Sequence, residues 1–102
     1  MRLIDIQKSV NPKKKWTATF CKCSGDTKCK PGDRKTVHFG ASRYEDYTIH
    51  KDKERRRLYR LRHAKEKHQA PDTPGALSYH ILWGESTSFE ENIRSFRKKM
   101  TC

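Results

Sequence analysis

The sequence predicts an α+β fold: a small antiparallel three-stranded sheet followed by two to three helices packed on one face. Alternating apolar and polar residues in the first forty positions predict the strands, and apolar residues at helical spacing near the C-terminus predict the helices. The chain has 102 residues, which is the size of one domain. We therefore expect one basic α+β domain over residues 1–102, with a sheet and hairpin region at 1–40, a basic helix at 52–67 and C-terminal helices at 76–100.

Three segments of the first forty residues are expected to form the sheet. Residues 3–6 are mostly apolar, and residues 16–21 and 35–39 alternate with period two, which is typical of strands with one buried face. Residues 24–33 are rich in Gly, Pro, Asp and Lys, so they are predicted to form a long exposed hairpin loop. The apolar residues of the two alternating segments are expected to meet on one side of the sheet: Trp16, Ala18, Phe20, Val37 and Phe39.

A basic helix is predicted to begin at Asp52, a residue type that caps helix N-termini, and to continue to about Lys67. Leu58 and Leu61 lie three residues apart, so they are expected to provide the packing of this helix. Because this apolar stripe is narrow, most of the helix must face solvent or a partner. Asp46, in the aromatic-rich connection before the helix, is expected to pair with one of its arginines.

Two further helices are expected near the C-terminus. Residues 76–83 form the most apolar run of the chain and predict a short buried helix that Gly84 stops. The last helix is predicted to begin at Ser88, because Ser88 and Glu91 have the spacing of a capping box, in which each side chain bonds to the other residue's backbone. Its apolar residues recur at helical spacing and form one face: Phe89, Ile93, Phe96 and Met100.

The charge balance points to a polyanionic partner. Twenty-four Lys and Arg stand against twelve Asp and Glu, which gives a formal charge of +12. Packing does not require such an excess, whereas nucleic acid favours it because each neutralised phosphate releases counterions. No apolar run approaches the roughly 20 residues that span a bilayer, and the apolar N-terminal stretch contains an acid. We therefore expect neither a membrane partner nor a signal peptide.

Three separated basic clusters are the candidate binding residues. Residues 51–67 hold nine Lys or Arg against three acids, with arginine favoured in the middle. A guanidinium binds phosphate with two hydrogen bonds, which favours contact of this segment with a polyanion. The alternative interpretation is a charged face that only keeps the protein soluble. No base-reading motif is present, so contacts with the phosphate backbone are expected. The expected nucleic-acid-binding residues are Lys13, Lys14, Lys15, Arg55, Arg56, Arg57, Arg60, Arg62, His63, Lys65, Arg97, Lys98 and Lys99.

The four cysteines are expected to be reduced and free of metal. Cys21, Cys23 and Cys29 lie close together and Cys102 is the last residue, but no secretion signal favours disulfides. The C-x-C spacing of the first two is poor for a zinc knuckle, although His38 or Cys102 is available as a fourth ligand. Disulfide formation and zinc binding remain the alternatives.

The sequence predicts no enzymatic activity and no cofactor. H-E-x-x-H, G-x-S-x-G and a Gly-rich phosphate loop are all missing from it. A metal-dependent nuclease built on His50, Asp52 and His63 is the least favoured hypothesis, because this spacing matches no known ligand pattern.

An ordered set of short motifs occupies residues 34–100. They are HFG at 38–40, DYT-x-HKD at 46–52, R-x-RH at 60–63, G-x-LS at 75–78 and ILW at 81–83. In this order they resemble a family of small, basic, uncharacterised proteins encoded by large and giant DNA viruses of protists. The resemblance implies an intracellular viral protein of the virion, the host nucleus or the cytoplasmic viral factory. It also implies nucleosomes or viral histone-like proteins as partners beside DNA, and it implies no particular catalytic activity.

The leading hypothesis is a non-enzymatic, largely sequence-independent DNA- or chromatin-binding protein of a large DNA virus that acts in genome packaging or organisation. The alternative is an interaction protein of the virion or viral factory whose basic surface docks an acidic protein. The sequence leaves open the choice among DNA, RNA and acidic protein, and it is compatible with a homo-oligomer.

Overall fold

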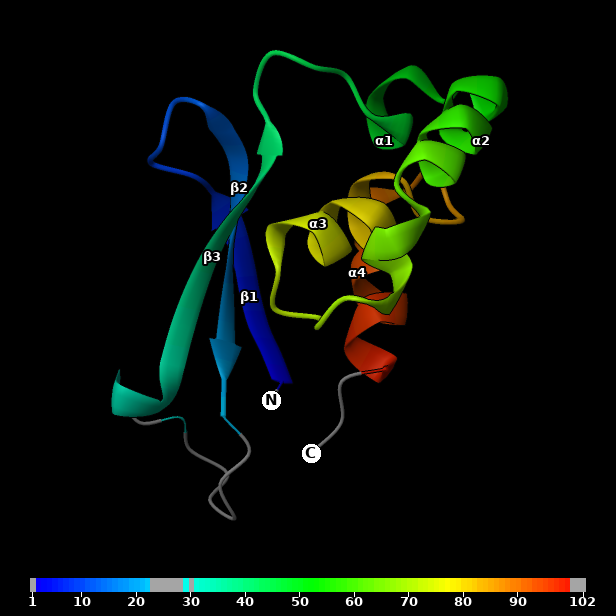
Figure 1. Ribbon diagram of the computed structural model, residues 1–102. Helices are drawn as coiled ribbons and strands as arrows, with labels where there is room; N and C mark the ends of the chain where they lie inside the picture. Colours follow the sequence, from blue (N-terminus) through cyan, green and yellow to red (C-terminus); the bar gives the residue numbers. More distant parts are fainter. Residues whose placement is uncertain (1, 23–28, 30, 100–102) are drawn as a thin grey trace.

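The computed structural model describes residues 2–22, 29 and 31–99, and it has the predicted α+β fold (Figure 1). The antiparallel sheet has the strand order β1 (Arg2–Lys8), β2 (Lys14–Cys21) and β3 (Arg34–Ala41). A 3-10 turn, η1 (Pro31–Asp33), precedes β3. The helical part contains α1 (Tyr47–His50), α2 (Lys53–Arg62), the 3-10 helix η2 (Ala64–His68), α3 (Pro74–Leu77), the π-helical turn η3 (Ser78–Leu82) and α4 (Phe89–Lys98).

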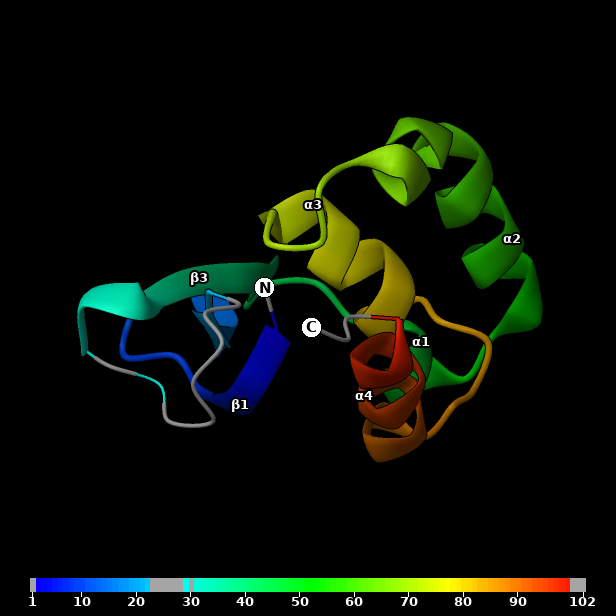
Figure 2. The same ribbon diagram turned by 90° about the horizontal axis from the view of Figure 1, so that it is seen from below.

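The helices cover one face of the sheet in two layers (Figure 2). Helices α3 and α4 lie beside the sheet together with η3, whereas α2 lies on the outer side of η3, away from the strands. The core fills the space between the sheet and the inner layer, and its largest fully buried side chains are Phe20, Phe39, Leu77, Ile81 and Leu82. Because α2 adds no buried residue to this core, other contacts must hold it in place.

The predicted pairing of the alternating segments is confirmed. Trp16 lies opposite Phe39 and Ala18 lies opposite Val37 on neighbouring strands, so the apolar faces coincide. Strand β3 continues one residue past Gly40, which has a φ of +79°. A Cβ atom at Gly40 would come 2.9 Å from Leu82 Cδ1, so glycine here provides both the backbone conformation and the space for η3 to approach the sheet.

Three predicted helix features need correction. The basic helix ends at Arg62 rather than near Lys67, and its last predicted residues form the separate 3-10 helix η2. The predicted buried helix at 76–83 begins at Pro74 and changes to a π-helical turn from Ser78 onward. The end of the basic helix at Arg62 and the change to a π-helical turn at Ser78 therefore depend on tertiary contacts that local propensity does not encode.

The third correction concerns the capping box of α4. Ser88 Oγ accepts from the backbone N–H of Glu91 as predicted, at 3.3 Å. The carboxylate of Glu91 does not return to Ser88; it accepts from the Ser86 hydroxyl at 2.6 Å, and Ser86 Oγ accepts from Ser88 N–H at 2.9 Å. Ser86 thus bridges Ser88 and Glu91, in place of the direct bond from Glu91 to Ser88 that the capping box predicts. In the predicted apolar face of α4, Phe96 is buried, whereas Met100 lies outside the described residues.

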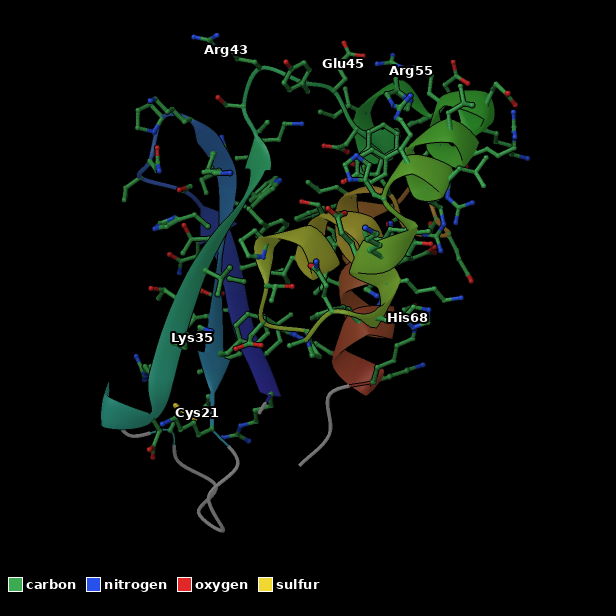
Figure 3. The ribbon with its side chains drawn as sticks, in the orientation of Figure 1. Cys21, Lys35, Arg43, Glu45, Arg55 and His68 are labelled. Carbon is green, nitrogen blue, oxygen red and sulfur yellow. A yellow bond between two sulfur atoms is a disulfide. The ribbon has the colours of Figure 1, made fainter. Side chains whose placement is uncertain are left out.

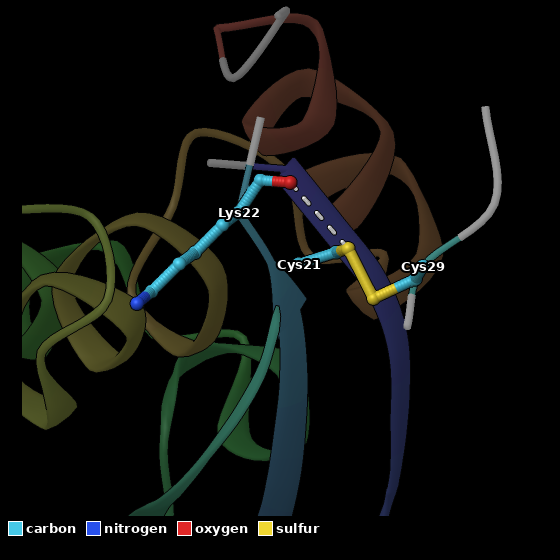
Figure 4. Close-up of a disulfide and its surroundings, with 3 residues drawn as sticks. All are labelled: Cys21, Lys22 and Cys29. Atoms are coloured by element: carbon cyan, nitrogen blue, oxygen red, sulfur yellow. Dashed lines mark hydrogen bonds between the residues drawn. A yellow bond between two sulfur atoms is a disulfide. The ribbon is translucent and has the colours of Figure 1, made fainter. Parts of the chain in front are cut away.

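The expectation of reduced cysteines is wrong for two of the four. Cys21, at the end of β2, and Cys29, across the loop, form a disulfide with their Cα atoms 5.9 Å apart (Figure 4). The antiparallel hairpin places these residues at a separation that a disulfide can bridge, which C-x-C spacing does not reveal. Cys23, Cys102 and residues 24–28 and 30 of the predicted hairpin loop lie outside the described residues.

This disulfide leads to a direct chemical prediction. When protein purified under non-reducing conditions is alkylated and digested, Cys21 and Cys29 should be recovered in one linked peptide fraction without alkylation. Reduction before alkylation should make both thiols reactive. Full alkylation of Cys21 in unreduced, denatured protein would restore the expectation of reduced thiols.

Candidate nucleic-acid interface

Two arginines attach helix α2 to the rest of the molecule. Arg56 Nε donates to the Gly84 carbonyl at 2.7 Å, and Arg60 Nη1 donates to the Trp83 carbonyl at 2.8 Å. The Arg60 guanidinium also lies over the Tyr79 ring, with Cζ 4.1 Å from the ring centroid. Burial lowers the pKa of the Arg60 guanidinium from its usual value. These two side chains therefore hold α2 against the residues after η3 instead of extending into solvent.

The acceptors of these arginines lie just beyond the C-terminal end of η3. Carbonyls at a helix end lack intrahelical partners and form the negative pole of the helix dipole, so they favour cationic donors. Asn92 of α4 completes the arrangement, because its buried Nδ2 donates to the Ile81 carbonyl at 2.8 Å. Side chains from two different helices thus satisfy carbonyls at the end of η3 and just beyond it.

Tyr59 provides the aromatic contact of α2. Its ring stacks on Trp83 with centroids 4.2 Å apart and on His63 at 4.2 Å, and burial raises its pKa above the usual value. Leu58 and Leu61 are 40% and 63% exposed. The prediction that these leucines provide the packing is wrong, because Tyr59 and the two arginines occupy the inner side of the helix.

A buried ion pair fixes the connection between β3 and α1. Lys15 Nζ lies 2.8 Å from Asp46 Oδ2, and Asp46 is 2% exposed. Asp46 Oδ1 accepts from the Thr48 N–H at 3.0 Å and from the Thr48 hydroxyl, which caps α1. The expected pairing of Asp46 with an arginine of α2 is therefore wrong. Arg55 of α2 instead lies 3.7 Å from Glu45, where both side chains are largely exposed.

A cleft of about 550 Å³ separates the end of the sheet from α2. Its floor includes Leu82 and Trp83, and its α2 wall carries Arg55, Leu58 and Arg62. Arg62 makes no ion pair or side-chain hydrogen bond within residues 2–22, 29 and 31–99. The cleft therefore combines an apolar floor with two exposed guanidinium groups, of which Arg55 lies near Glu45.

A second hollow adjoins the cleft and is lined by Lys13, Arg43 and Tyr44, among others. Tyr44 lines both hollows and is 73% exposed. Arg43 and Arg55 lie along the same upper edge of the molecule as Glu45 (Figure 3). Among the described residues that line the two hollows, five are Lys or Arg and two are Asp or Glu. We call the cleft and this adjoining hollow together the joined hollows. Their surface is predominantly cationic around the exposed ring of Tyr44.

A comparison with protein families finds a match, over residues 4–63, to a family model described as "Family of unknown function (DUF5754)". This span is more than half of the chain. The chain belongs to the DUF5754 family. Searches of the curated proteins and of the solved structures found no match.

The DUF5754 match runs from β1 to the residue after α2. The matched segment therefore contains the strand, loop and α2 residues that line the two hollows. It does not contain Leu82 and Trp83, which form the floor of the cleft. The DUF5754 segment alone leaves Arg56 and Arg60 without the carbonyls that they bind, because Trp83 and Gly84 follow it.

The structure separates the predicted binding residues into three groups. Lys13, Arg55 and Arg62 line the joined hollows. Lys15, Arg56, Arg60 and His63 are engaged in contacts within the molecule, His63 with Glu66 and Tyr59. Of these four, Lys15 and His63 also line the cleft. The remaining predicted residues lie elsewhere: Lys14 at the start of β2, Arg57 paired with Glu54, Lys65 in η2, and Arg97, Lys98 and Lys99 at the C-terminal end of α4.

The end of α4 lies at the opposite end of the molecule from the β1–β2 turn (Figure 1). Arg97, although exposed, donates to the Ile4 carbonyl at 2.9 Å and so ties α4 to β1. The C-terminal basic cluster therefore lies apart from the Lys13, Arg55 and Arg62 side chains that line the joined hollows.

Arg43 and Tyr44 are candidate interface residues that the sequence pattern did not indicate. The connection around them is rich in aromatic residues, which is a signal for order but not for exposure. Only the fold distinguishes Tyr44 from Tyr47, three residues later, which is 4% exposed.

Within the described ranges, no group of three or more His, Cys, Asp or Glu is arranged to hold a metal ion. None of the helices described by the structure is long and apolar enough to cross a membrane. The absence of enzymatic activity stays a prediction.

Proposed function

We propose that this protein binds DNA or chromatin with little dependence on base sequence and without catalysis. Its place in genome packaging or organisation of a large DNA virus, in the virion, the host nucleus or a viral factory, is part of the same proposal. Nucleosomes and viral histone-like proteins are proposed partners beside DNA.

One observation carries the proposal. Exposed cations from three separate segments, Lys13 of the β1–β2 turn, Arg43 of the loop after β3 and Arg55 and Arg62 of α2, surround the joined hollows. Phosphate groups match such a surface, because guanidinium groups bind them with two hydrogen bonds and an extended anion reaches several segments at once. The proposed contact set is therefore smaller than the thirteen residues expected from the sequence and includes Arg43.

An acidic protein surface is the second candidate partner. Leu61 is 63% exposed and lies on α2 beside Arg62. An apolar residue among cations suits an amphipathic acidic protein better than a phosphate backbone. Replacing Leu61 with serine distinguishes the two, because it should weaken binding to an acidic protein and leave DNA binding unchanged.

The DNA proposal leads to a prediction for the double variant Arg55→Ala, Arg62→Ala. Its affinity for duplex DNA should fall, and the slope of log affinity against log salt should decrease by about 2, one for each phosphate that the variant no longer binds. The reduction in affinity should be similar for duplexes of unrelated sequence. Fluorescence anisotropy with two labelled duplexes at several salt concentrations measures both quantities.

A matched control removes the same charge at the other end of the molecule. The variant Lys98→Ala, Lys99→Ala should keep the wild-type salt slope, and both variants should retain the wild-type circular dichroism spectrum. Equal reductions in affinity in the two variants would contradict a localised interface. A preference of more than about a hundredfold for one duplex would contradict sequence-independent binding, since it corresponds to about 2.7 kcal/mol, near the upper end of the roughly 1–3 kcal/mol that a mismatched base pair costs a sequence-specific protein.

A further inference from the structure

Tyr44 differs from the other tyrosines of the described chain in having no packing role. Tyr47 and Tyr79 are 4% and 5% exposed, and Tyr59 is stacked between Trp83 and His63. Tyr44 is 73% exposed, and no ring contact or side-chain hydrogen bond involves it within residues 2–22, 29 and 31–99. Its ring therefore offers a face to a partner.

The loop that carries Tyr44 is anchored by hydrogen bonds at and before this residue. Ser42 N–H donates to the Lys13 carbonyl at 3.1 Å, and Ser42 Oγ donates to the Pro12 carbonyl at 2.8 Å. Tyr44 N–H donates to the Ala41 carbonyl at 3.2 Å. These bonds hold the loop against the β1–β2 turn, so the backbone of Tyr44 is positioned before any partner binds, which reduces the entropy cost of binding.

Cations line both of the hollows that Tyr44 shares. Lys13 and Arg43 line the hollow on one side of Tyr44, and Arg55 and Arg62 line the cleft on the other. An aromatic ring between two cationic hollows suits a nucleic-acid strand whose base stacks on the ring while its flanking phosphates contact the cations. Bases within a duplex hide their faces against their neighbours, whereas an unpaired base exposes one.

We propose that Tyr44 is a stacking platform for an unpaired base, and that this interface binds single-stranded polynucleotide in preference to duplex. The proposal rests on nucleic-acid binding at the joined hollows and specifies which form of nucleic acid is bound. Stacking on an aromatic face accepts any base, so this preference agrees with binding that is independent of sequence. DNA and RNA strands share the required chemistry.

The test measures the affinities of labelled oligo-dT, oligo-rU and a duplex of equal length by fluorescence anisotropy. The wild-type protein should bind one or both single strands more tightly than the duplex. Tyr44→Ala should weaken single-strand binding by about 5-fold to 150-fold, the range found for removal of one base–aromatic stack, and should change duplex binding by less than about 2-fold. Tyr44→Phe should keep the wild-type affinity, because the ring and not the hydroxyl makes the contact.

Val10→Ala is the matched control, since Val10 is 94% exposed in the nearby β1–β2 turn and its replacement removes apolar surface without removing a ring. It should bind every oligonucleotide as the wild type does. If the wild-type protein binds duplex but Tyr44→Ala binds single strands as tightly as the wild type, the stacking proposal is overturned and the proposed function stands. If the wild-type protein binds neither form at low salt, both are overturned. The loss of affinity that Tyr44→Ala causes on oligo-dT, compared with its loss on oligo-rU, identifies whether the ring stacks preferentially on DNA or RNA bases.

Discussion

Replacing Arg56 and Arg60 together with alanine should lower the free energy of unfolding by about 3 kcal/mol or more. Each side chain donates a charged hydrogen bond to a carbonyl at the end of η3, and such a bond contributes about 1.5–3 kcal/mol. The substitution also leaves the carbonyls of Trp83 and Gly84 without these donors. Urea unfolding followed by circular dichroism measures the change.

Arg62 provides the control on the same helix. It is exposed and has no side-chain partner in the described part of the chain, so Arg62→Ala should change the free energy of unfolding by less than about 0.5 kcal/mol. If the Arg56 and Arg60 variant is as stable as Arg62→Ala, the two arginines do not attach α2. The pair would then be available to an anion.

The variant Lys15→Met should lower the free energy of unfolding by about 3–5 kcal/mol, the usual cost of removing one partner from a buried ion pair. Asp46 is 2% exposed, so its carboxylate would lose its cation at a position that is largely shielded from water. The methionine keeps most of the volume of the lysine side chain, which limits the contribution of a cavity. Urea unfolding again provides the measurement.

The double variant Lys15→Met, Asp46→Asn separates the ion pair from packing. Asparagine retains an oxygen that accepts from the Thr48 N–H, so it still caps α1, but it carries no charge. The double variant should therefore be more stable than Lys15→Met alone. A simple sum of the two single-variant effects would mean that Lys15 and Asp46 do not interact energetically.

The sheet and the last helix could be predicted from sequence because their signals are local. Period-two alternation predicted that the apolar residues of β2 and β3 share one face, and Trp16 and Ala18 indeed lie opposite Phe39 and Val37. The serine before α4 accepts from the predicted N–H. The basic helix was harder to predict, because its start is marked by Asp52 but its packing is not marked by apolar residues. Leu58 and Leu61 are exposed, and no periodic rule predicts that arginines and a tyrosine replace them at the packing face.

The candidate interface could be predicted only in part, for the same reason. Composition indicates an anionic partner, but it assigns equal weight to Arg60, which binds carbonyls, and to Arg62, which has no such partner among the described residues. Tyr44 and Arg43 became candidates only when the loop after β3 was placed against the β1–β2 turn. Distinguishing such residues requires the contacts between elements that are distant in sequence.

The inward orientation of Arg56 and Arg60 has a consequence for binding kinetics. A cation that binds a neutral carbonyl keeps its charge, so it still adds to the potential that attracts an anion from beyond the molecular surface. It makes no contact with the anion after arrival. The rate of encounter should therefore reflect the full charge of +12, whereas the lifetime of the complex should reflect only the few outward-facing groups. For the proposed nucleic-acid binding we therefore expect fast capture and fast release, which would let the protein redistribute along the polymer.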